Sequence, residues 1–238
     1  MKTKKYAFLL CFMLSCVCLS AQDREVITVS SNDNIAELIS EDKQYIFPEF
    51  TSGRVIYKTK RPVGGGKLNY NLLFGEMVFI DPANEIFALE DVKDILMVVI
   101  DNRRFYPHRN EEFTEELFET TSEVQLHIKR EFTIISDGKE GAYGLSFSAA
   151  SISHYSHVDA QGSSRQQLAI KENMLVQRKN TYYLVGKNDK HKLIKGVKTF
   201  QELFPKQKKQ IESFVKEHNI SFNKEEDLMN LIKYCDTL

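Results

Sequence analysis

Short apolar runs rich in Val, Ile, Phe and Tyr dominate residues 45–198, separated by turn residues at intervals of about ten. No apolar repeat with the helical period extends over a useful length before residue 199. The pattern therefore predicts an α+β protein that is mostly β, in which an antiparallel β-meander forms a sandwich, a roll or a partial barrel. The expected strands cover residues 45–50, 54–60, 67–73, 76–81, 85–89, 95–101, 103–107, 113–118, 123–135, 167–178, 181–186 and 191–195.

Two of the expected strands also indicate their surroundings. Residues 95–100 are apolar at six consecutive positions, which predicts a central strand covered on both faces. Residues 123–135 alternate instead, with Leu126 and Ile128 in one phase and His127 in the other. We therefore expect one buried and one solvated face, and we interpret His127 as a solvated histidine and not as a catalytic base.

The apolar period changes to that of a helix in the C-terminal tail. Thr199 and Asn223, each followed three residues later by glutamate, fit capping boxes that begin two helices. The helical repeats contain Ile211, Phe214, Val215 and His218, then Leu228, Leu231, Ile232 and Cys235. We expect residues 199–238 to form a two-helix hairpin packed on the β-rich domain, with Cys235 as a buried, inert thiol.

The first 21 residues have the features of an export signal. A lysine-rich start precedes an apolar run over Ala7–Leu14, and Leu19-Ser20-Ala21 supplies a small-residue end before Gln22. The sequence thus predicts a signal peptide over 1–21 and an exported protein, periplasmic or secreted. A lipoprotein modified at Cys16 is the alternative, although Leu14 stands where such signals usually carry a small residue.

The remaining chain divides into three expected parts. Residues 22–44 form a polar lead-in with a short strand and a brief helix, and residues 45–198 form the β-rich domain that precedes the helical tail. A serine-rich loop over 146–164 interrupts the β-rich domain. His154, His157 and Asp159 in this loop are close enough to share a cation, but no second ligand cluster accompanies them, so we expect neither a metal nor another cofactor.

Composition and charge exclude several classes of protein. With 42% hydrophobic and 11% aromatic residues, the chain is not intrinsically disordered in bulk. No segment after the signal has the roughly 18 consecutive apolar residues of a transmembrane helix. Loss of the three signal lysines changes the formal charge from −1 to −4, and nucleic acid is not expected as a partner of an acidic exported protein.

Charge is nevertheless distributed unevenly. Residues 187–209, here called the basic segment, could bind an envelope protein, an anionic lipid or a glycan, or could be a solvated connection. Asn69 and Asn71 share one face of their strand, where their amides could meet a ligand or bond to strand and turn backbone. The candidate lysines are Lys190, Lys192, Lys195, Lys198, Lys206, Lys208 and Lys209.

No complete catalytic constellation is found in the sequence. A Gly-x-Ser-x-Gly elbow is absent, and the serines concentrate in the loop over 146–164, where a nucleophile would be poorly pre-organised. The glutamates of residues 111–123 lack an interleaved base and are expected on a solvated surface. We therefore predict no catalytic residue.

Several motifs together carry a resemblance to a known family. They are Gly66-Lys67-Leu68-Asn69-Tyr70-Asn71-Leu72-Leu73, Gly141-Ala142-Tyr143-Gly144, Leu203-Phe204-Pro205-Lys206 and Glu225-Glu226-Asp227-Leu228. With a signal that ends Leu-Ser-Ala-Gln, the chain resembles a family of uncharacterised exported proteins of Gram-negative bacteria. The resemblance implies export and a single unit over roughly 53–236, and it implies no activity and no catalytic residue.

Three functional hypotheses follow from the sequence. The first is a non-enzymatic, envelope-associated binding or structural protein whose contact region includes the basic segment. The second is a hydrolase with a site assembled from distant strands. The third is a periplasmic carrier of a small ligand.

Overall fold

A computed structural model describes residues 27–29, 35–59, 63–136, 150–151 and 174–238. These residues form one antiparallel sheet with strand order β1-β11-β9-β8-β7-β6-β2-β3-β4-β5, with β10 added to β9 and β12 added to β11. The strands are β1 (Ile27–Val29), β2 (Thr51–Tyr57), β3 (Gly64–Asn71), β4 (Glu76–Ile80), β5 (Ile86–Ala88), β6 (Ile95–Ile100), β7 (Arg103–Pro107), β8 (Phe113–Glu119), β9 (Gln125–Ser136), β10 (Ala150–Ser151), β11 (Met174–Val185) and β12 (His191–Leu193).

The helices are short and lie at two places in the chain. Because strands make up most of its regular structure, the protein is α+β and mostly β, as the sequence predicts. The helices are α1 (Ile35–Leu38), α2 (Glu41–Gln44), α4 (Val197–Leu203), α5 (Lys208–Glu217) and α6 (Glu225–Thr237), with single 3₁₀ turns η1 (Val92–Asp94) and η2 (Arg109–Glu111). None of the described helices combines the length and the apolar character that crossing a membrane requires.

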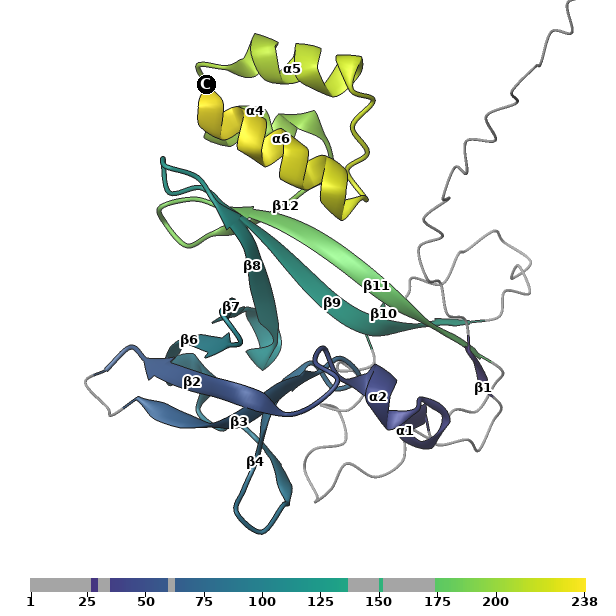
Figure 1. Cartoon of the computed structure of the whole chain (residues 1–238). Coiled ribbons are helices and arrows are strands. Elements are labelled where there is room, and N and C mark those ends of the chain that lie inside the picture. Colours follow the sequence, from purple (N-terminus) through teal and green to yellow (C-terminus); the bar gives the residue numbers. More distant parts are fainter. Residues whose placement is uncertain (1–26, 30–34, 60–62, 137–149, 152–173) are drawn as a thin grey trace, which may run out of the picture.

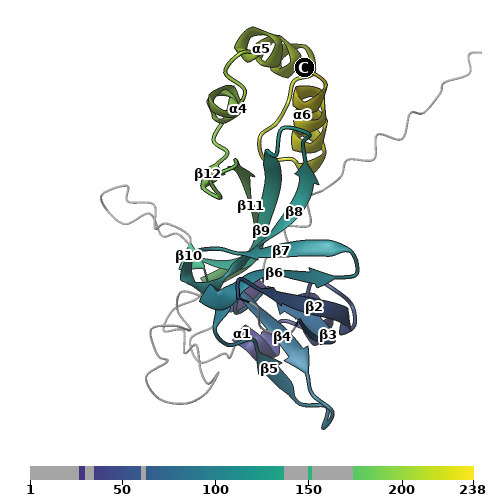
Figure 2. The same cartoon turned by 90° about the vertical axis from the view of Figure 1, so that its left-hand side faces the viewer.

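The sheet is open, because its end strands β1 and β5 do not pair with each other within the described residues. The sandwich, roll or partial barrel expected from the sequence is not confirmed. Strands β2, β6 and β7 run across the direction of β8 and β9, so the sheet turns sharply between these two groups (Figures 1 and 2). A register shift between Glu116 and Phe118 in the β8–β9 ladder lies in this region, where such irregularities increase local twist.

Two hydrophobic cores occupy the two ends of the sheet. The first packs β2, β3, β4 and β6 around aromatic side chains such as Tyr70 and Phe105. The second packs α4, α5 and α6 on β8, β9 and β11, as Figure 1 shows. Strands β9 and β11 belong to both cores, since Phe132 lies in the first while Leu126 and Leu184 lie in the second.

The β9–β11 ladder corrects one strand assignment. The sequence predicted two strands over 167–178 and 181–186 with a turn at Lys179-Asn180. Instead β11 is continuous from Met174 to Val185, and Asn180 pairs with Arg130 in the middle of the ladder. Twelve successive pairs outweigh the local turn preference of Lys-Asn.

The C-terminal tail contains three helices, so the expected two-helix hairpin is not confirmed. The helix α4 begins at Val197 after Gly196 and makes no side-chain cap, while Pro205 lies between α4 and α5. The predicted boxes at Thr199 and Asn223 are therefore absent, because each helix begins at a different residue: Val197, Lys208 and Glu225. The apolar stripe of the last helix is confirmed, with Leu228, Leu231, Ile232 and Cys235 buried.

Polar contacts hold both ends of α6 on the sheet. Arg130 of β9 donates a hydrogen bond to Glu225 at the start of the helix, with 3.1 Å between nitrogen and oxygen. At the other end, the carboxylate of Asp236 accepts hydrogen bonds from the backbone and the hydroxyl of Thr121 in the β8–β9 turn. These contacts fix the register of α6 on the apolar face of β9.

Strand β6 is internal to the sheet, but only one of its faces is fully covered. Ile95, Val98 and Ile100 are buried, whereas Leu96 is 46% exposed. The prediction that both faces are covered was therefore wrong. A register shift between Ile56 and Tyr57 in the β2–β6 ladder leaves Leu96 without a paired residue, and Leu96 lies at the edge of an open cleft.

The second core provides a test of how the tail contributes to stability. Leu231 is 0% exposed, so Leu231→Ala should lower the free energy of unfolding by about 2–5 kcal/mol through lost burial and a cavity. Urea unfolding monitored by circular dichroism measures this change. Lys233→Ala, an exposed neighbour on the same helix, should change stability by less than about 0.5 kcal/mol. Equal stability of the Leu231→Ala variant and the parent would contradict the packing described here.

Candidate functional site

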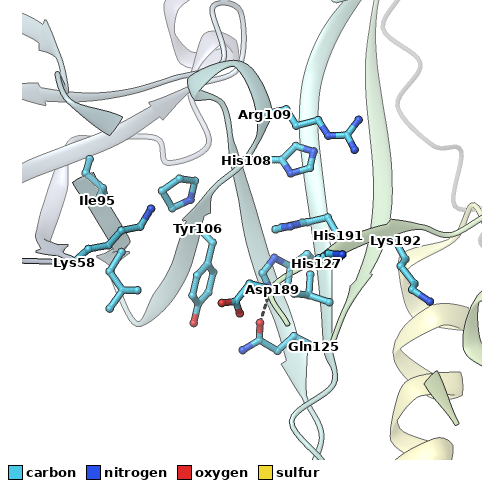
Figure 3. A pocket seen from close by; sticks show the side chains of 14 residues that line it. Lys58, Ile95, Tyr106, His108, Arg109, Gln125, His127, Asp189, His191 and Lys192 are labelled. Atoms are coloured by element: carbon cyan, nitrogen blue, oxygen red, sulfur yellow. Dashed lines mark hydrogen bonds between the residues drawn. The ribbon is translucent and has the colours of Figure 1, made fainter. Parts of the chain in front are cut away.

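A cleft of about 690 Å³ is lined by residues of β6 and β7 and by residues of β9 and β12. Figure 3 shows three histidines gathered on one side of this cleft, with Lys58 and Ile95 across from them. The sequence places the lining residues on seven separate elements or their ends, so only the folded sheet brings them together. They are Lys58, Ile95, Leu96, Tyr106, Pro107, His108, Arg109, Gln125, His127, Val185, Asp189, Lys190, His191 and Lys192.

The three histidines form a compact group of rings, here called the histidine cluster. The ring centroids of His108 and His191 lie 4.5 Å apart, and those of His127 and His191 lie 5.2 Å apart. Tyr183 packs 5.0 Å from His108, and Tyr106 packs 5.1 Å from His127. The cluster therefore joins β7, β9, β11 and β12 into one aromatic wall of the cleft.

The cluster corrects the interpretation of His127. The prediction that Leu126 and Ile128 lie on a buried face of β9 is confirmed, but His127 on the opposite face is only 1% exposed. The turn in the sheet places Tyr106 and His191 over this second face. Alternation along a strand correctly separates the two faces, yet it does not reveal what covers the polar one.

The hydrogen bonds of the cluster are consistent with one direction of donation along a chain. The amide nitrogen of Gln125 donates to Glu119 at 3.2 Å, which turns the amide oxygen toward Nε2 of His127 at 2.9 Å. His127 therefore carries its proton on Nε2, and its bare Nδ1 accepts the hydroxyl proton of Thr114 at 2.9 Å. The Thr114 oxygen in turn accepts Nε2–H of His191 at 3.1 Å.

Burial keeps the cluster neutral near pH 7. It lowers the pKa of His127 to about 3, with further contributions from His191 and His108. Burial also lowers the pKa of His108 to about 4, helped by His191, Lys129 and Arg109. The pKa of His191 is lowered by burial as well, but a backbone hydrogen bond and the carboxylate of Asp189 oppose this effect. His191 is thus the member whose charged form has favourable neighbours.

The charged residues at the cleft are mostly cationic. Arg109 and Lys190 make no ion pair within the described part of the chain, and both side chains are exposed. The ammonium of Lys58 donates to the carbonyl of Lys93 at 2.8 Å, and Lys192 pairs with Glu202 at 2.8 Å. Asp189 supplies the opposing carboxylate. The rim of the cleft therefore attracts anions.

Beside the cluster, ion pairs connect β8 to its neighbours and correct the expectation of a solvated acidic surface for Glu112 and Glu115, whereas Glu111, Glu119 and Glu123 are exposed as expected. Lys129 pairs with Glu112 at 2.6 Å and with Glu131 at 2.7 Å. Burial alone would lower the pKa of Lys129, but the two carboxylates raise it. Glu115 is likewise buried and pairs with Arg103 and Arg130. Their basic partners come from other strands, which is why the stretch 111–123 alone gave no sign of them.

The predicted lysines divide between two regions. Lys190 and Lys192 line the cleft, and their binding role stays a prediction. The others lie outside the cleft, on the connection from β12 to α4 and around the start of α5. They are Lys195, Lys198, Lys206, Lys208 and Lys209, and all are exposed.

The two asparagines lie away from the cleft and bind backbone. The side chain of Asn69 accepts from the amide of Phe47 at 3.1 Å and donates to its carbonyl at 2.9 Å. The oxygen of Asn71 accepts from the amides of Leu73 and Phe74. This geometry agrees with the alternative in which these amides support strands and turns.

Metal ligands and the free thiol have separate outcomes. Within the described ranges, no three His, Cys, Asp or Glu side chains converge as a metal site would require. His154, His157 and Asp159 lie outside the described residues. Cys235 is buried as predicted, and burial raises its pKa to about 12, so its reactive thiolate is scarce.

Comparison of the chain with protein-family models, with curated protein sequences and with solved structures found no match. The resemblance to a family of exported proteins therefore stays a prediction.

The neutral histidines should make the protein less stable in acid. His127 has a folded pKa near 3 and an unfolded pKa near 6.5, so the folded state binds fewer protons between these values. Stability from this histidine is complete above about pH 6.5 and falls by up to about 1.4 kcal/mol per pH unit below it. Urea unfolding across this range should show a smaller slope for His127→Gln.

The exposed His218 on α5 provides the matched control for this measurement. His218→Gln should keep the slope of the parent protein. If His127→Gln also kept that slope, His127 would have to be protonated in the folded state throughout the range.

Proposed function

We propose that this protein is a non-enzymatic, exported binding protein that holds an anionic saccharide in the histidine-lined cleft. The observation that carries the proposal is a neutral aromatic wall with the exposed cations Arg109 and Lys190 at its rim, neither of which forms an ion pair with another described residue. The cations attract negative charge, while Tyr106 and the half-buried imidazoles of His108 and His191 offer ring faces and hydrogen-bonding groups to sugar rings. Export remains part of the proposal on the evidence of residues 1–21.

The dimensions of the cleft support a small ligand over the other partners considered. About 690 Å³ falls within the usual range for sites that enclose small molecules. A lipid chain would need an apolar cavity, whereas this cleft contains Lys58, Arg109 and Asp189. An anionic saccharide matches both the charge and the aromatic wall.

The hydrolase hypothesis has less support from this geometry. Thr114 is the hydroxyl nearest to a candidate base, with its oxygen 2.9 Å from His127. However, Thr114 is 0% exposed and its hydroxyl is shared with His191, so a substrate has no route to it. The Thr114–His127 pair is better suited to holding imidazoles in place than to nucleophilic attack.

Calorimetric titration with lactose sulfate, and with neutral lactose as the matched ligand, tests the proposal. Lactose sulfate should bind saturably at low salt and lactose much more weakly, because the rim cations act only on the charged ligand. Arg109→Gln combined with Lys190→Gln should weaken binding at least about tenfold, equivalent to about 1.4 kcal/mol.

The control changes the same amount of charge outside the cleft. Lys206→Gln combined with Lys208→Gln should leave the affinity within about twofold. An equal loss in both double variants would assign binding to the basic segment in general. No saturable binding of lactose sulfate would overturn the proposed ligand.

A further inference from the structure

The hydrogen-bond chain of the cluster ends on His191, and this determines where an additional proton can go. His127 uses both ring nitrogens, Nε2 toward Gln125 and Nδ1 toward Thr114. Protonation of its Nδ1 would oppose the hydroxyl proton of Thr114 and break the chain. His191 donates through Nε2, so a proton on its Nδ1 leaves every bond of the chain in place.

The groups that surround His191 come from every element packed against it. His108 at the end of β7, His127 on β9 and Tyr183 on β11 present rings at 4.5, 5.2 and 5.8 Å. Thr114 of β8 contributes its hydroxyl. The charged neighbours are Arg109 of η2, which disfavours a cation, and Asp189 before β12, which favours one. Lys190 and Lys192 flank His191 in sequence.

Burial lowers the pKa of His191 below its usual value and outweighs the backbone hydrogen bond and the carboxylate of Asp189, while the repulsion from Arg109 adds a smaller lowering. An anion placed beside Arg109 and Lys190 would neutralise the repulsion that Arg109 exerts. It would also attract a cationic imidazole directly. Because linkage is reciprocal, a ligand that favours the protonated ring must bind more tightly when that ring is protonated.

We propose that an anionic ligand binds in the cleft together with one proton, which is taken up on Nδ1 of His191, so that affinity rises as the solution becomes acidic. This inference rests on the proposed binding function and adds its regulation. The proton enters from solvent, and no bond of the ligand is made or broken. The cluster thereby converts a fall in pH into tighter retention of the ligand.

The test is calorimetric titration of the full-length chain with lactose sulfate, whose sulfate ester stays ionised throughout. Measurements near pH 6.5 in two cationic buffers of different ionisation enthalpy give the number of protons taken up. We expect about 0.5 to 1 proton per ligand, and about a tenfold gain in affinity between about pH 7.5 and pH 5.5.

The variant His191→Gln removes the titrating ring and keeps an amide donor for Thr114. It should bind lactose sulfate without proton uptake and with a flat pH profile, whatever its affinity near pH 7.5. His218→Gln, on exposed surface, should retain both effects. Proton uptake that persisted in His191→Gln would assign the proton to another group and overturn the inference.

A measurement on the unaltered protein covers the case in which His191→Gln does not fold. Nitrogen-15 chemical shifts of the imidazoles should show His127 and His191 protonated on Nε2 near pH 7.5. Lactose sulfate should shift the titration of His191, and not that of His127, to higher pH. Absence of binding at every pH would overturn the proposed function itself, whereas binding with no pH dependence would overturn only the proton coupling.

Discussion

The ladder between β9 and β11 is the constraint on which the rest of this structure depends. Its twelve residue pairs cross the turn in the sheet and carry apolar side chains into both hydrophobic cores. On one face it presents Leu126 and Leu184 to the helices, and on the other it pairs His127 with Tyr183. A shift of one residue would place the histidine among the helices and the leucines in the cleft, so burial of the apolar face fixes the site.

The proposed function depends on buried polar side chains that have hydrogen-bond partners. Thr114 and His127 are almost inaccessible to solvent, and the chain from Glu119 to His191 gives each a partner. Buried polar groups without partners would cost stability, so this network holds the rings in one arrangement. The ion pairs of Lys129 and Glu115 support the same region of the sheet from the adjoining strands.

The sequence predicted what depends on local periodicity. It placed most strands, the β9 alternation and the buried stripe of Leu228, Leu231 and Cys235 correctly. It did not identify His108 or His191, because neither lies in a motif and the cluster joins residues as distant as Thr114 and His191, 77 positions apart. It also misjudged Leu96 and the turn at Asn180, where the register shift of the β2–β6 ladder and the long β9–β11 ladder prevail over local pattern. The signals of the site in the sequence were a histidine in the polar phase of a long strand, at His127, and the basic segment that contains Lys190 and Lys192.

The most direct measurement of the central claim is anomalous diffraction from crystals of the protein soaked in selenate. We expect a selenium peak in the cleft, within hydrogen-bonding distance of Arg109, Lys190 or His191. Selenium peaks confined to the exposed lysines around α5, with none in the cleft, would contradict the claim that the histidine-lined cleft is the anion site.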